Sequence, residues 1–294
     1  MNKDVALAAA VVSGGLVALQ QRINGELGHD LHDPLLAAVV SFGTGLVVMA
    51  VLVTRRLEVL PRVRQVPWWS RVGGLGGATL VAVGATAAPR IGVALLTVGL
   101  VSGTTVAALL VDRAGLGPGG RKDLTPPRIA GAALCLFAIG LSAREGLKAA
   151  SPLLLAMVVV AGGVISVQQA LNGRVRAATD AVCATFLNFT VGTTALVVAL
   201  LVQGVAEGVR ADHWPHQPWL YLGGPIGCVF IAMAATTVST LGVLRLGLAT
   251  TAGQLIGGVL IDLDSGVSAT TLATVALTLV AVGVSGASRR RVLA

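Results

Sequence analysis

The chain has 294 residues, of which 55% are hydrophobic and only 12% are charged, and its mean hydropathy is +0.86. Soluble globular domains carry about 25% charged residues, so this composition excludes an ordinary soluble domain and also a disordered chain. The formal net charge is +8, but the basic residues fall between apolar segments without the interleaved aromatics of nucleic-acid sites. We expect an integral membrane protein that contacts the lipid bilayer and does not bind nucleic acid.

Ten apolar segments follow one another along the chain, and most approach the roughly 20 residues that a membrane-spanning helix needs. The chain also contains 38 glycines, which favour close packing between membrane helices. The expected fold is therefore an all-α integral membrane protein with ten transmembrane helices. The predicted segments are 5–27, 34–54, 72–88, 91–111, 128–143, 152–173, 181–203, 219–240, 246–261 and 267–287.

The distribution of Lys and Arg predicts the orientation of these segments. If the N-terminus is cytoplasmic, 16 of the 21 basic residues fall on the cytoplasmic side and five on the other side. Positively charged loops remain cytoplasmic in membrane proteins. We therefore expect a multi-pass protein of the cytoplasmic (inner) membrane with both termini in the cytoplasm.

The two halves of the chain resemble each other. The pattern Gly-Gly-x(4)-Gln-Gln-x-x-Asn-Gly occurs at residues 14–25 and again at 162–173, and Trp69 corresponds to Trp219. Each half holds five segments, an odd number, so the second half would enter the membrane from the opposite side. We expect two inverted five-helix repeats, residues 1–146 and 147–294, an arrangement typical of secondary transporters.

These motifs, together with the stretch from Gly253-Gln254 to Asp262, resemble the YdcZ branch of the drug/metabolite transporter (EamA-like) superfamily. The resemblance covers essentially the whole chain and implies an inner-membrane transporter of five-plus-five organisation. It leaves the substrate open. One departure from symmetry is that Thr104 occupies the position in the first half that Gln254 occupies in the second.

The candidate substrate-binding residues are uncharged polar side chains within the predicted spans. Side chains three and four positions apart share one helix face, and carboxamides both donate and accept hydrogen bonds, which suits a neutral or zwitterionic solute. A structural role, in which the same groups hold helices together, remains open. The candidates are Gln20, Gln21, Asn24, Ser41, Gln168, Gln169, Asn172, Asn188 and Gln254.

The acidic residues lie at the ends of the predicted segments. We expect Glu26 to pair with Arg22, four residues earlier, and Asp112 and Asp262 to be solvated at the membrane interface. The predicted spans contain no carboxylate at their centres. This lowers the expectation of a proton-coupled exporter of cations, which needs a buried titrating acid.

Together, these patterns favour a secondary transporter that moves a small polar organic metabolite by alternating access. Proton-coupled drug or cation efflux, a non-transporting scaffold or partner subunit, a lipid-handling protein and a homo-oligomer remain open alternatives. No cluster of His, Cys or acidic residues lies in the spans, so we expect no enzyme activity, no metal and no cofactor.

Overall fold

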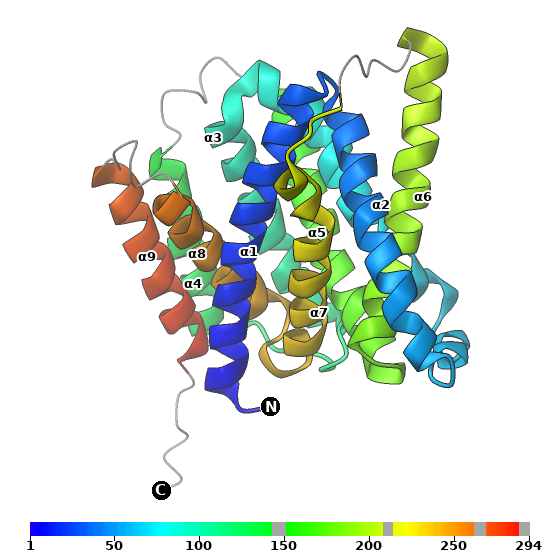
Figure 1. The fold of residues 1–294 in the computed structure, drawn as a ribbon. Helices are drawn as coiled ribbons and strands as arrows, with labels where there is room; N and C mark the ends of the chain where they lie inside the picture. Colours follow the sequence, from blue (N-terminus) through cyan, green and yellow to red (C-terminus); the bar gives the residue numbers. More distant parts are fainter. Residues whose placement is uncertain (143–150, 208–213, 262–268, 288–294) are drawn as a thin grey trace, which may run out of the picture.

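The computed structural model describes residues 1–142, 151–207, 214–261 and 269–287, and within these ranges the chain is helical without strands (Figure 1). Short 3-10 helices lie at 54–56, 60–65, 68–72 and 218–222. The α-helices are α1 (Lys3–Asp30), α2 (Pro34–Val53), α3 (Leu75–Ala114), α4 (Pro126–Ser142), α5 (Pro152–Ala178), α6 (Ala181–Glu207), α7 (Gly223–Leu241), α8 (Val243–Ile261) and α9 (Ala269–Gly286).

Local sequence explains where the helices begin. Asp33 precedes α2, and its carboxylate accepts hydrogen bonds from the backbone N–H groups of Leu35 (2.9 Å) and Leu36 (3.0 Å). Asp180 caps α6 in the same way, through the N–H of Cys183 at 2.8 Å. Such caps satisfy N–H groups that have no partner inside the helix.

The structure confirms the expected all-α membrane class. Seven helical segments of the described chain are long and apolar enough to cross a membrane, and two shorter apolar helices, Pro126–Gly140 and Leu272–Gly286, accompany them. In Figure 1, α1 begins and α9 ends on the same lower side of the bundle.

The predicted spans 72–88 and 91–111 differ from the structure, because one continuous helix, α3, covers both. A straight helix of 40 residues would be about 60 Å long. The residues just before and just after α3 nevertheless contact the same side chain: Arg174 stacks on Trp69 and donates hydrogen bonds to the carbonyls of Gly115 and Leu116. The helix therefore folds back on itself in the stretch that contains Pro89, whose missing N–H weakens the helical pattern there.

The main helix contacts join the first half of the chain to the second. Helix α3 packs along α5, α1 along α8, α4 along α9 and α2 along α6. Glycines allow this close approach: a Cβ atom at Gly103 would overlap the carbonyl oxygen of Val159, and one at Gly253 would overlap that of Val11. The core is thus formed between the halves as well as within each of them.

The close glycine contacts occur in matched pairs. The contact of Gly14 with Thr250 corresponds to that of Gly162 with Leu100. The contact of Gly74 with Asn188 corresponds to that of Gly224 with Ser41. Corresponding residues of the two halves are 147 to 150 positions apart in the chain. These glycine contacts of the first half thus recur at the corresponding positions of the second half.

Candidate functional site

The amides of the second half meet where α5 and α6 approach the start of α3. The Nδ2 group of Asn172 donates a hydrogen bond of 2.9 Å to Oδ1 of Asn188, and both side chains are buried. A Cβ atom at Gly73 would overlap Oδ1 of Asn172, so the Asn172 amide packs directly against this glycine and would have to shift for a larger residue. Two of the predicted candidates are therefore in direct contact.

The equivalent residues of the first half come together around Gly223 at the start of α7. A Cβ atom at Gly223 would overlap Oδ1 of Asn24 and lie 2.9 Å from Oγ of Ser41. Neither of these oxygens has a hydrogen-bond partner among the described residues, although both are buried. The shorter Ser41 side chain takes the place of Asn188, so the first half has unsatisfied polar atoms where the second half has a hydrogen bond.

Gln20 and Gln168 occupy matched positions beside glycines of the opposite half. The side chain of Gln168 lies against Gly76, and Nε2 of Gln20 would be 2.6 Å from a Cβ atom at Gly227. The buried Oε1 atom of Gln168 has no partner among the described residues. A buried amide oxygen without a donor carries a desolvation cost of about 1–3 kcal/mol. A ligand that donated a hydrogen bond to this oxygen would remove that cost.

Two phenylalanines that were not among the predicted candidates lie beside the amides of Gln20 and Gln168. Phe42 of α2 and Phe189 of α6 have ring centroids 5.2 Å apart at an interplanar angle of 41°. Phe42 lies against Gly77 and Gly192. Phe189 lies correspondingly against Gly45 and Gly227. The signal was present, because each phenylalanine directly follows a candidate residue, Ser41 or Asn188, in the repeat.

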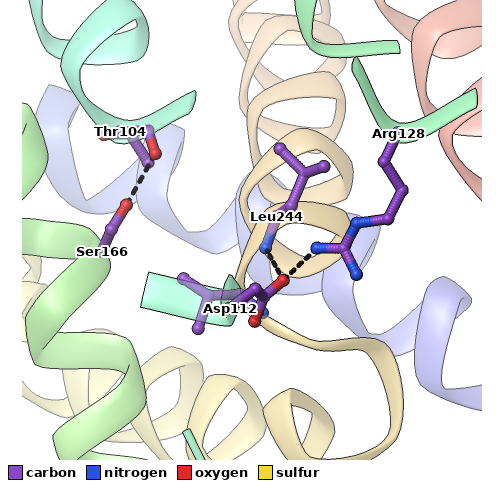
Figure 2. Close-up of polar contacts among 6 residues, drawn as sticks. Thr104, Asp112, Arg128, Ser166 and Leu244 are labelled. Atoms are coloured by element: carbon purple, nitrogen blue, oxygen red, sulfur yellow. Dashed lines mark hydrogen bonds and ion pairs between the residues drawn. The ribbon is translucent and has the colours of Figure 1, made fainter. Parts of the chain in front are cut away.

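Gln21 and Gln254 form a separate pair. Nε2 of Gln254 donates a hydrogen bond of 2.8 Å to Oε1 of Gln21, whose side chain is exposed. The corresponding Thr104 instead donates to the carbonyl of Gly162 (3.0 Å), and its own carbonyl accepts from Ser166 (2.7 Å; Figure 2). Oε1 of Gln169 is buried without a described partner.

Asp112 is not solvated, which corrects the expectation from its place at a segment end. Its side chain is only 3% exposed, forms an ion pair with Arg128 and accepts hydrogen bonds from the N–H groups of Val243 (2.8 Å) and Leu244 (3.1 Å; Figure 2). The reason is the interruption of the helix at Gly242, between α7 and α8, where a φ of +79° favours glycine. This break leaves the first N–H groups of α8 in need of an acceptor. Asp262 lies outside the described residues.

Two further polar contacts join α2 and α6 at their opposite ends. Asp33 accepts a hydrogen bond of 3.1 Å from Nε2 of Gln203, and Asp180 pairs with Arg56 at 3.5 Å. The expected pair of Arg22 and Glu26 is present on α1. Among the described residues no group of three His, Cys, Asp or Glu side chains could hold a metal ion.

Comparison with known proteins identifies the family of this chain. The model of the family described as "Putative inner membrane exporter, YdcZ" matches the chain twice, over residues 5–141 and 153–286. The chain belongs to the YdcZ family. This confirms the resemblance seen in the repeated Gln-Gln-x-x-Asn-Gly motif and makes the protein a multi-pass inner-membrane protein of a transporter family.

The structural comparison supports the fold of this YdcZ family member. A crystal structure of another protein aligns with a TM-score of 0.67 at 20% sequence identity, covering 97% of this chain and 96% of that chain. At this identity the likeness concerns the fold alone. No curated protein matches the sequence.

Proposed function

We propose that the protein is a secondary transporter that moves a small polar organic metabolite across the inner membrane by alternating access. In this proposal ten helices form two inverted five-helix repeats, residues 1–146 and 147–294, with both termini in the cytoplasm. The matched contacts between the halves and the two family matches, 5–141 and 153–286, support this organisation.

The count of ten rests on how α3 folds. Seven segments meet the length and hydropathy expected of a membrane span, and α4 and α9 are shorter apolar helices. The first arm of α3, from Leu75, is the tenth. An even number of crossings agrees with α1 beginning and α9 ending on the same side (Figure 1). Five of these crossings precede residue 146, so a cytoplasmic N-terminus predicts that the segment around residue 146 is periplasmic.

The substrate-binding region that we propose is the cluster around the Phe42–Phe189 pair. It combines two aromatic rings with the amides of Gln20 and Gln168. Such a set of groups suits a neutral or zwitterionic molecule with an apolar part, because the rings offer apolar surface and the amides offer both donors and acceptors.

The single observation that carries this proposal is the buried, unpartnered Oε1 atom of Gln168 next to the aromatic pair. In proteins, buried polar atoms normally have a hydrogen-bond partner. A bound substrate that donates a hydrogen bond would provide one. Asn172 and Asn188 are hydrogen-bonded to each other and would support the site rather than contact the substrate.

The test is a screen of metabolite pools against the purified protein, first by thermal shift and then by uptake into proteoliposomes. Gln168→Ala should weaken binding of a hit about tenfold, since a lost hydrogen bond to an uncharged group is worth about 1 kcal/mol and an orphaned donor costs more. Gln65→Ala is the matched control, because Gln65 is exposed in a 3-10 helix. If hits bind all three proteins equally, the proposed site is wrong.

The same assay distinguishes the mechanism. Transport driven by a solute gradient, and unaffected by Glu26→Gln, agrees with the proposal. Transport of cations driven by a pH gradient and abolished by Glu26→Gln would instead indicate proton-coupled efflux. Reporter fusions near residue 146 that give a cytoplasmic signal, with both termini also cytoplasmic, would contradict the inverted repeat.

A further inference from the structure

A group of basic side chains lies where α1, α4 and α8 begin and α9 ends. Arg128 at the start of α4 is only 9% exposed. Arg245 lies in the first turn of α8, and its guanidinium occupies the space that a Cβ atom at Gly286 of α9 would fill. The stem of Lys122 lies against Gly242, directly before α8. We call Lys122, Arg128 and Arg245 the basic cluster.

The acidic groups near the basic cluster do not neutralise it. Asp112 pairs with Arg128 and also accepts two backbone hydrogen bonds from α8. Asp4 of α1 attracts Arg245 electrostatically but does not form an ion pair with it. Lys3, the residue before Asp4, adds a further positive charge near Lys122. Within the described part of the chain, Arg245 and Lys122 have no ion pair.

Hydrogen bonding in the basic cluster is also incomplete. The Nε groups of Arg128 and Arg245 are both buried and have no acceptor among the described residues. A buried guanidinium donor without an acceptor is costly. The two guanidinium groups also repel each other across the interface of α4 and α8.

The position of Arg245 adds a second electrostatic argument. The first turn of a helix carries the positive end of the helix dipole, which favours anions and disfavours cations. Asp112 already accepts the first N–H groups of α8, but its charge is shared with Arg128. Arg245, beside two other cations, therefore has no counter-ion of its own in the described part of the chain. Desolvation together with Arg128 and Lys3 lowers the pKa of Lys122, while Asp112 opposes this shift. The cluster therefore has an excess of positive charge at one end of the bundle.

We propose that the basic cluster binds a phosphate-type anion through Arg245, with Lys122 and Arg128 adding positive charge. Guanidinium groups present paired donors that match phosphate oxygens. The anion has two chemical sources, the headgroup of an acidic phospholipid and free inorganic phosphate. Basic pockets between membrane helices bind anionic headgroups in other proteins. This site is separate from the proposed substrate site and does not depend on it.

The experiment measures binding to the purified full-length protein in detergent by thermal shift and native mass spectrometry. The probes are dioctanoyl phosphatidylglycerol, dioctanoyl phosphatidylcholine and inorganic phosphate. Stabilisation by phosphatidylglycerol alone assigns the site to a lipid headgroup, and stabilisation by inorganic phosphate as well assigns it to phosphate in general. Equal effects of phosphatidylglycerol and phosphatidylcholine, with none from inorganic phosphate, overturn the proposal.

Variants separate a specific site from general surface charge. Arg245→Gln should weaken binding about tenfold or more, whereas Arg62→Gln, which removes an exposed arginine of a 3-10 helix, should change it only a few-fold. Lys122→Gln should give a smaller loss than Arg245→Gln and provides the test if that variant does not fold. Equal losses in Arg62→Gln and in the variants of the basic cluster would show diffuse attraction and refute a specific site.

Discussion

Phe42 and Phe189 stand at the same place in the two halves of the chain, and their rings contact each other with centroids 5.2 Å apart. Each ring lies against one glycine of the opposite half, Phe42 against Gly192 and Phe189 against Gly45, and also against one glycine of its own half. At this pair, corresponding residues of the two halves contact each other, and the amides of Gln20 and Gln168 lie beside the rings.

This contact predicts unequal costs for its two members. Phe189 is 2% exposed, so Phe189→Ala should destabilise the protein by about 3–5 kcal/mol through the lost contacts and the cavity left behind. Phe42 is only partly buried, so Phe42→Ala should cost less. Thermal denaturation in detergent measures both. Phe137→Ala, at a position 61% exposed on α4, is the control and should change the midpoint little.

Asp112 should be required for stability. Asp112→Asn removes the charge that compensates the buried Arg128 and should cost about 3–5 kcal/mol, because an unpaired charge remains buried. Asp123→Asn provides the comparison, since the pair of Asp123 with Arg113 is exposed and such pairs contribute about 0–1 kcal/mol. Similar denaturation midpoints for the two variants would contradict the role assigned to Asp112.

The close helix contacts predict the effect of adding a methyl group. Gly103→Ala and Gly253→Ala should both destabilise strongly and to a similar extent, because each new Cβ atom would overlap a backbone carbonyl of the paired helix. Gly84→Ala in α3 meets nothing within 4 Å and should stabilise by up to about 1 kcal/mol through helix propensity. Denaturation midpoints that follow the opposite order would contradict the packing of α1 on α8 and of α3 on α5.

The two asparagines at matched positions should respond differently to truncation. Asn172→Ala breaks a buried hydrogen bond and leaves Asn188 without its partner, so we expect a loss of about 1–3 kcal/mol. Asn24→Ala removes a side chain whose Oδ1 atom is already unpartnered and should cost less. Equal losses, measured by thermal denaturation, would show that the hydrogen bond to Asn188 adds nothing to stability.

Much of the architecture could be predicted from the sequence because it is written in local patterns. The charge content identifies the membrane class, and the repeated Gln-Gln-x-x-Asn-Gly motif identifies the family. The predicted segments 5–27 and 34–54 lie close to α1 and α2. The predicted gap between 88 and 91 does not end a helix in the structure, because the chain bends there within one helix, α3.

The site was harder to predict, because its contacts join residues that are far apart in the chain. The spacing of Gln20 and Asn24 placed them on one helix face, but it could not show that Phe42 meets Phe189 across two helices. Asp112 was misjudged for the same reason: its partners Val243 and Leu244 lie more than 130 residues away. The expected cavity role of the nine candidate residues stays a prediction.

The exchange of helices between the halves has a consequence for any attempt to divide the protein. Helix α5 lies along α3, and α1 lies along α8, so each half inserts its first helix into the other. If the chain were divided between residues 146 and 147, each fragment would expose the glycine-rich helix surface that the other half normally covers. Co-expression should restore the assembly, in the manner of an intertwined dimer, whereas neither fragment should be stable alone.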